Sequence, residues 1–422
     1  MSRTLRIHIP VYLQILIGMC AGIAIGFIAL AVDGQQVITD WVKPWGQIFV
    51  RLLQLIAVPL VFVSLVKGVI ELGDISKFSK MGLKTIVIYV ITTIVAILIG
   101  IVLVTTIRPG RFFDASQTIM LEQTVTSVME NPAKQGSPLN FLLDIVPNNI
   151  FNAIGDNSKM MQIIFFALLF GVAALTVGKE KIQPVLSLFT SLNEIILKMV
   201  DFIIKTAPLG VLALMAGVVV DSSGNARLFG ALAVYAITVT IGLFFLILVF
   251  YPLIIRFFTH IPVARFMKEA YPLQLLAFST SSSSAVMPVT MDVARNKLGI
   301  NEEVCSFVMP TGTTLNMDGT SCFQAISVIF IAQVLGLDLS LGQMFTIILM
   351  TTISSLGTPG IPGGSYVVMT MVLTSVGIPA QGLALILGID RPLDMLRTSV
   401  NVTGDIVVAA LVEPKTSAIK TE

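Results

Sequence analysis

The residues best suited to chemistry lie in one stretch near the end of the chain, Asp390 to Asp405. This stretch carries five formal charges, yet it continues an apolar run at residues 383–387 and leads into another at residues 406–412. Each Asp or Arg at the centre of a membrane helix costs about 2.5–3.5 kcal/mol, so five of them facing lipid would cost on the order of 15 kcal/mol. The pattern predicts a membrane helix whose charges face protein, water or a charged ligand.

A helical wheel brings these polar groups together. At roughly 100° per residue, one face about 100° wide holds Asp390, Asp394, Arg397, Thr398, Asn401 and Asp405. Arg391 falls close to this face. A charged small molecule or cations could bind there. A second interpretation is a mutually satisfied buried pair of Asp394 and Arg397. For Asp390 and Arg391 we favour a pair at the helix end near the membrane interface.

Composition independently indicates a polytopic, all-α membrane protein. Hydrophobic residues make up 55% of the chain and charged residues 12%, and the mean hydropathy is +0.93, whereas soluble domains are about 25% charged. The net charge of +2 gives no reason to expect a nucleic-acid partner. The cysteines lie in apolar segments without CxxC spacing, so we expect core thiols rather than disulfides or a zinc site.

The elements that must position the charged helix begin with a series of apolar stretches. Those before residue 260 are residues 12–32, 44–72, 84–107, 155–178, 185–219 and 228–258, and about 20 residues suffice to cross a bilayer. The first follows a basic start and resembles a signal peptide, but it is too long and lacks a cleavage site, so we interpret it as a retained helix. Basic connections at the N-terminus and at residues 71–84 and 256–268 predict cytoplasmic termini. Residues 108–138 are polar and predict an extracellular loop.

Two later segments interrupt this pattern. Residues 272–294 contain the serine run Ser279 to Ser284 and Pro288, and residues 345–376 contain a Gly- and Pro-rich stretch. Each flank is about half a membrane thick, which predicts re-entrant hairpins at about 262–297 and 341–376, because irregular backbone at that depth must be buried or line a cavity. Each hairpin precedes a helix with a polar break, so the same unit of hairpin and broken helix occurs twice. Two such units are typical of the inverted repeats of secondary transporters, and they predict eight helices, two hairpins and a ligand site near the membrane midplane.

Other functional classes remain open at this stage. Glycine-rich tips at membrane depth also occur in channel filters, so an ion channel is the main rival. An enzyme would use Gly404-Asp405 as half of an intramembrane aspartyl protease pair, but a second motif of that type is missing. The serine run could also be a flexible linker, although its place between apolar flanks argues against this. Saturable, gradient-driven accumulation would fit only a carrier.

Four ordered motifs carry a resemblance to a known family. They are Ser281 to Thr290, Asn316 to Thr320, Gly357 to Gly363, and the polar helix Asp394 to Asp405. Over essentially its whole length the chain resembles prokaryotic members of the glutamate/aspartate transporter family, the dicarboxylate/amino acid:cation symporters. The resemblance implies a non-enzymatic symporter of L-aspartate or L-glutamate, driven by the sodium gradient through alternating access. A proton-coupled glutamate or C4-dicarboxylate symporter is the alternative.

The resemblance implies a substrate site. Arg397 would bind the substrate side-chain carboxylate with its planar fork, and Asp394 would accept hydrogen bonds from the amino group. The α-carboxylate would bind Asn401, Ser283 and backbone amides at the hairpin tips. The full implied set is Ser281, Ser283, Thr320, Ile361, Gly364, Asp394, Arg397, Thr398 and Asn401.

The chain departs from the family pattern at two places. Some relatives carry Arg at the position of Ser281 or of Met395, whereas this chain has Arg391 instead. Pro359 in the second tip is also unusual and could stiffen that tip.

Up to three sodium sites are implied as well, since hard cations prefer oxygen ligands. One would use the carbonyls of Gly312, Asn316 and Asn401 with the Asp405 carboxylate. A second would use the carbonyls of Thr314, Ser355, Leu356 and Thr358. A third would use Tyr89, Thr92, Thr93, Asn316 and Asp318. The polar cluster Tyr89, Thr92 and Thr93 in an otherwise apolar helix supports this third site independently.

The resemblance finally implies a homotrimer of elevator type in the inner (plasma) membrane. Residues 1–78 would form scaffold helices one and two, and residues 79–107 helix three of the transport domain. Residues 108–225 would form the extracellular loop and scaffold helices four and five. Residues 226–422 would complete the transport domain with helix six, the first hairpin, helix seven, the second hairpin and helix eight.

Overall fold

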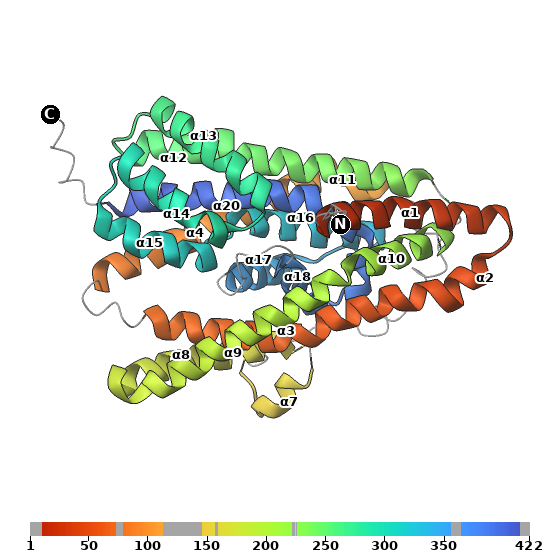
Figure 1. Ribbon diagram of the computed structural model, residues 1–422, viewed down its shortest axis with the longest axis horizontal. Coiled ribbons are helices and arrows are strands. Elements are labelled where there is room, and N and C mark those ends of the chain that lie inside the picture. The colour runs from red at the N-terminus through yellow and green to blue at the C-terminus, as the bar shows by residue number, and fades with distance from the viewer. Residues whose placement is uncertain are drawn as a thin grey trace, which may run out of the picture.

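The computed structural model describes residues 11–72, 79–112, 146–156, 159–221, 224, 226–355 and 364–413. Within these ranges the chain is all helical and has no strand (Figure 1). The all-α class is therefore confirmed. The predicted extracellular loop lies mostly outside the described residues.

The apolar stretches of the sequence form long helices. The helices of the first half are α1 Val11–Ala31, α2 Gln35–Val37, α3 Lys43–Leu72, α4 Ser79–Ile107, α7 Ile150–Ile154 and α8 Met160–Val177. They are followed by α9 Lys179–Lys205, α10 Ala207–Asp221, α11 Ala226–Phe245 and α12 Tyr251–Phe258. π-Helical turns at Ile38–Val42 and Leu246–Phe250 join α2 to α3 and α11 to α12.

Several helical runs are suited to a membrane. Those among the described residues that are long and apolar enough to cross it are Leu13–Ala31, Gln35–Ile70, Met81–Arg111, Gly230–Phe258, Glu302–Val334 and Asp390–Val412. The predicted single helix 185–219 is instead the pair α9 and α10, bent by 50°, because Pro208 has no N–H with which to continue the ladder of α9. The chain is a multi-pass membrane protein.

The two segments with small and polar residues form pairs of short helices. The first pair is α13, Val263–Thr280, and α14, Ser283–Asp292, with a left-handed turn at Ser281, where φ is 51°. The second pair is α17, Leu341–Ser355, and α18, Gly364–Ser375. A π-helical turn, Val293–Lys297, extends the first pair to the predicted boundary. The tip of the second pair, with Pro359, lies outside the described residues.

The two predicted helix breaks have different outcomes. The Asn316 motif does separate α15, Glu302–Leu315, from α16, Asp318–Val334, because Asn316 and Met317 leave the helical conformation. The expected break within the charged helix is wrong: α20 is continuous from Asp390 to Val412 and follows the short helix α19, Ala384–Leu387. Pro392 lies in the first turn of α20, where a helix tolerates proline, and inward-facing charges require no bend.

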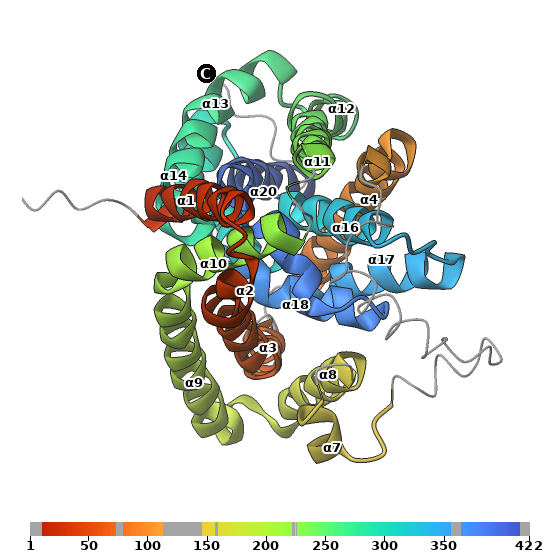
Figure 2. The same ribbon diagram turned by 90° about the vertical axis from the view of Figure 1, so that its right-hand side faces the viewer.

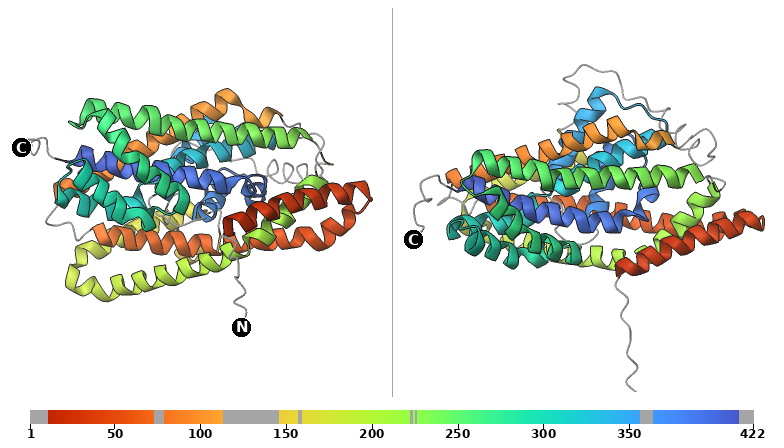
Figure 3. Two further views of the ribbon diagram at one scale, coloured as in Figure 1. Left: turned by 45° about the horizontal axis from the view of Figure 1, so that its top comes forward. Right: turned by 90° about the horizontal axis from the view of Figure 1, so that it is seen from above.

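The polar helices lie at the centre of the bundle (Figure 2). Buried residues make up 94% of the apolar window of α15–α16 and 83% of that of α20, against 29% in α1 and 33% in α4. Helix α4 packs on α16, and α13 packs on α20. Figure 3 shows α20 running beside α11, which it contacts. The five charges of α20 are thus turned toward protein, as the cost of exposing them to lipid requires.

A second group of helices packs along the other side. Helix α3 contacts α8, α9 and α10, and α1 packs along α10. Gly18, Gly22 and Gly26 lie one turn apart on α1, and a Cβ at Gly22 would overlap the backbone carbonyl of Leu212 on α10. Small residues at this spacing allow two membrane helices to approach closely.

Candidate cation and substrate site

The first buried carboxylate, Asp318, lies at the start of α16 and is fully buried. Its Oδ1 accepts hydrogen bonds from the hydroxyls of Thr93 (2.8 Å) and Thr92 (3.3 Å) on α4. Its Oδ2 accepts one from the Tyr251 hydroxyl on α12 at 3.0 Å. Among the described residues no basic side chain forms an ion pair with Asp318. The predicted trio Thr92, Thr93 and Asp318 is brought together by the packing of α4 on α16.

The second buried carboxylate, Asp405, lies on α20. Its Oδ1 accepts a hydrogen bond from Asn316 Nδ2 at 2.9 Å. The other end of that amide, Asn316 Oδ1, is buried and has no hydrogen-bond partner within the described part of the chain. Gly312 lies directly against this carboxylate, and a Cβ there would overlap Asp405 Oδ1 and lie 2.8 Å from the Tyr89 hydroxyl. Asp405 likewise forms no ion pair with a described residue. The donor set fits a sodium ion, which prefers oxygen ligands.

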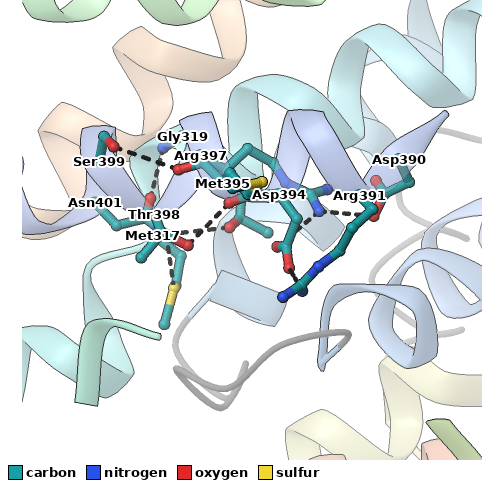
Figure 4. Close-up of polar contacts among 11 residues, drawn as sticks. Met317, Gly319, Asp390, Arg391, Asp394, Met395, Arg397, Thr398, Ser399 and Asn401 are labelled. Carbon is teal, nitrogen blue, oxygen red and sulfur yellow. Dashed lines mark hydrogen bonds and ion pairs between the residues drawn. The ribbon is translucent and has the colours of Figure 1, made fainter. Parts of the chain in front are cut away.

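A charged cluster surrounds Arg397 on the same helix (Figure 4). The Arg397 side chain is fully buried, and its Nη2 donates to Asp394 Oδ1 (2.8 Å) and Asp390 Oδ2 (3.0 Å). The guanidinium carbon lies 3.8 Å from the centre of the Phe323 ring. The buried ion pair of Arg397 and Asp394 that the sequence left open is therefore present. Arg397 Nε and Nη1 have no hydrogen-bond partner among the described residues, so these two donor atoms can serve a ligand.

Arg391 occupies a place that the sequence did not predict. Its Nη1 donates to Asp394 Oδ2 at 2.9 Å, and the two side chains are only 13% and 12% exposed. The favoured pair of Asp390 and Arg391 near the membrane interface is wrong, because Asp390 is fully buried and its partner is Arg397. The helical spacing explains this, since Asp390, Asp394 and Arg397 lie on one face while adjacent residues are rotated by roughly 100°.

Asn401 links the charged cluster to the helix break. Its Oδ1 accepts a hydrogen bond from the Gly319 amide at 2.9 Å (Figure 4). Its Nδ2 donates to Thr320 Oγ1 at 3.2 Å. Thr398 Oγ1 donates to the backbone carbonyl of Asp394 at 2.9 Å. The predicted lining residues Thr320, Thr398 and Asn401 are thus held at the junction of α16 and α20.

Comparison with known proteins identifies the type of chain that carries this site. The model of the sodium:dicarboxylate symporter family matches residues 11–414. The chain belongs to this family. It is 37% identical to the proton/sodium-glutamate symport protein of Bacillus caldotenax over 402 residues, covering 94% of this chain and 92% of that protein. It is 34% identical to the proton/glutamate-aspartate symporter of Escherichia coli strain K12, covering 94% and 91%.

Relatives also occur outside bacteria. The chain is 33% identical to excitatory amino acid transporter 1 of Ambystoma tigrinum, covering 87% of this chain and 76% of that protein. The family and these relatives are transporters rather than enzymes, which removes the intramembrane protease alternative. The resemblance found in the four motifs is confirmed.

Four other residues predicted to bind substrate form no hydrogen bond or ion pair with the Arg397 cluster among the described residues. Ser281 and Ser283 are buried at the turn between α13 and α14, and both helices pack against α20. No residue that the structure describes forms a hydrogen bond with the Ser281 hydroxyl. Gly364 begins α18, and Ile361 lies outside the described residues. The roles of these four residues stay predictions.

The predicted second sodium site cannot be assembled from the described residues. The Thr314 side chain is exposed and donates to the carbonyl of Thr311, and the buried Ser355 hydroxyl donates to Thr352. Leu356 and Thr358 lie outside the described residues. This site also stays a prediction.

Sequence reasoning missed three residues of the site. Tyr251 could have been found from the sequence, because it places a hydroxyl inside an apolar helix, the same pattern that indicated Tyr89. Phe323 gave no signal, because an aromatic residue in a membrane helix is ordinary. The backbone carbonyl of Gln274 on α13 accepts a hydrogen bond from the Ser399 hydroxyl (2.8 Å), and its side-chain amide donates one to the Thr403 hydroxyl (3.2 Å). These partners on α20 become apparent only from the packing.

Proposed function

We propose that this protein is a secondary active symporter that carries L-aspartate or L-glutamate into the cell by alternating access, driven by the sodium gradient. The observation that carries the proposal is the pair of fully buried carboxylates, Asp318 and Asp405, neither of which forms an ion pair with a described residue. Hydroxyl groups surround Asp318, an amide group contacts Asp405, and Asp405 lies on the same helix as the buried Arg397 cluster.

Cation binding follows from the cost of burying charge. A buried carboxylate has to be paired with a cation or neutralised by a proton. The unpartnered Asn316 Oδ1 beside Asp405 and the hydroxyls around Asp318 are oxygen ligands suited to sodium. One sodium ion at each carboxylate, and a third at the predicted second site, would account for these groups of oxygen ligands.

Substrate charge would be set by Arg397. Its two unpartnered donors can form a bidentate contact with a carboxylate, and Asp394 can accept from an amino group. The relatives named for glutamate and aspartate support an acidic amino acid as the substrate. The names of these relatives also mention protons. A proton on Asp318 or Asp405 would neutralise the buried carboxylate as a sodium ion would, so proton-coupled symport is the alternative.

The architecture that we propose for this transport has eight membrane-crossing segments. They are α1, α3, α4, α8, the bent pair α9–α10, α11–α12, α15–α16 and α20. The pairs α13–α14 and α17–α18 would be re-entrant hairpins that form inverted repeats with the helices after them, since each of their helices has at most 18 residues. Both termini would be cytoplasmic.

We propose a division of the chain into a moving transport domain and a static scaffold, which the packing of the helices supports. Residues 79–107 and 226–422 would form the transport domain, which moves as an elevator. Residues 1–78 and 108–225 would form the scaffold of a homotrimer in the plasma membrane. The close packing of α1 on α10 and of α3 on α8 and α9 supports one rigid scaffold.

The test is uptake of radiolabelled L-aspartate by proteoliposomes containing the purified protein. An inward sodium gradient should drive saturable accumulation, and replacement of sodium by choline should abolish it. Aspartate affinity should rise steeply with sodium concentration. A flat affinity with accumulation driven by a pH gradient would replace sodium coupling with proton coupling, and non-saturable flux would favour a channel.

A further inference from the structure

The Asp394 carboxylate has a cation on each of its oxygen atoms. Arg397 Nη2 donates to Oδ1 at 2.8 Å, and Arg391 Nη1 donates to Oδ2 at 2.9 Å. Both arginines belong to the same helix, and Asp394 is buried except for 12% of its side chain. The acceptor assigned above to the substrate amino group is therefore already paired within the chain (Figure 4).

The charges of this cluster balance without a ligand. Asp390 and Asp394 contribute two negative charges, and Arg391 and Arg397 contribute two positive charges. An ammonium group that approached Asp394 would place a third cation beside one carboxylate. Like charges at this distance repel strongly in a poorly solvated site, so the weakest of the existing contacts has to open.

Arg391 is the contact that can open. Arg397 is fully buried, is held by both Asp390 and Asp394, and lies over the Phe323 ring. Arg391 retains 13% side-chain exposure at the edge of the cluster, so its long side chain can place its charge in water when this contact opens.

We propose that Arg391 is a built-in counter-cation for Asp394 that the amino group of the substrate displaces, so that Arg391 sets how much affinity an amino group contributes. The inference rests on the proposed function. When the ligand has an amino group, its ammonium takes over the pairing of Asp394. When the ligand has none, Arg391 stays in place and Asp394 remains paired.

The test compares two ligands that differ by the amino group, L-aspartate and succinate. Dissociation constants are measured in sodium for the wild-type protein and for Arg391→Gln, Arg391→Lys and Arg295→Gln. In Arg391→Gln the ratio of the succinate to the aspartate constant should rise about tenfold or more, because succinate would leave a buried carboxylate without this partner. Arg391→Lys should restore the ratio toward wild type. Arg295 forms an exposed ion pair with Glu302, so its change should leave the ratio unaltered.

A purely structural role for Arg391 gives a different result. Both ligands would then bind more weakly by the same factor in Arg391→Gln, and an unchanged ratio would overturn the inference. The effect should also vanish in an Asp394→Asn background, since a double-mutant cycle isolates this contact. If the wild-type protein binds succinate or aspartate with neither sodium nor proton dependence, the proposed function is wrong. If it binds aspartate as proposed, but Arg391→Gln leaves the ratio of the succinate to the aspartate dissociation constant unchanged, only the role of Arg391 is wrong.

Discussion

At the scale of single residues, the buried carboxylates should control cation affinity. Asp318→Asn or Asp405→Asn keeps the shape of the side chain but removes a charge that would contribute about 4 kcal/mol at about 4 Å and an effective dielectric constant of about 20. Sodium affinity should fall about tenfold or more, with aspartate affinity falling in step if the ligands are coupled. Binding titrations across sodium concentrations check this. Asp201→Asn, in an exposed ion pair with Lys198, is the control, and unaltered sodium dependence in both site variants would place the cations elsewhere.

Arg397 should determine the charge of the substrate. Arg397→Cys removes the only fully buried guanidinium of the described cluster, so aspartate binding should be lost, while Asp394, Asn401 and Ser283 could still hold a small neutral amino acid such as serine. The change also leaves Asp390 unpaired, which typically costs about 3–5 kcal/mol. Asp390→Asn in the same protein should therefore restore stability. Competition binding with aspartate and serine measures the switch, and Arg391→Cys should change aspartate binding far less. Retention of aspartate by Arg397→Cys would contradict the assignment.

At the scale of elements, the glycines of α1 should matter for stability only where two helices touch. A Cβ at Gly22 would overlap the Leu212 carbonyl of α10, whereas a Cβ at Gly68 of α3 meets no atom of the described residues within 4 Å. Gly22→Ala should destabilise the protein by about 1–3 kcal/mol. Gly68→Ala should stabilise it by up to about 1 kcal/mol, because alanine is the better helix former. Thermal unfolding of both variants decides this, and equal midpoints would argue against close packing of α1 on α10.

At the scale of the whole molecule, ligand binding should raise thermal stability. A ligand at one hundred times its dissociation constant stabilises the folded state by about 2.7 kcal/mol. Sodium alone should raise the unfolding temperature, and sodium with aspartate should raise it further, whereas aspartate in choline should have little effect. The buried thiols of Cys305 and Cys322 provide the readout, since a thiol-reactive dye reaches them on unfolding. Equal stabilisation by aspartate with and without sodium would contradict coupling.

The sequence by itself determined the all-α membrane class, the boundaries of the short helix pairs and the polar face of α20. Each depends on a local rule, namely the length of apolar runs, the position of Gly, Pro and Ser, or the helical period. The four motifs also determined the family. The helix break at Asn316 followed from sequence, but the expected break in α20 did not occur, because polar content alone does not interrupt a helix whose polar side chains face the protein interior.

The tertiary structure alone decided which partners meet. Tyr251 reaches Asp318 across 67 positions of sequence, and Asn316 reaches Asp405 across 89, distances over which no local pattern carries information. The partners of Asp394 and Asp390 within α20 also needed the structure, since the wheel places five charges on or near one face without saying which of them pair. Burial decides that pairing: the fully buried Arg397 pairs with both aspartates, and the partly exposed Arg391 pairs with the second oxygen of Asp394.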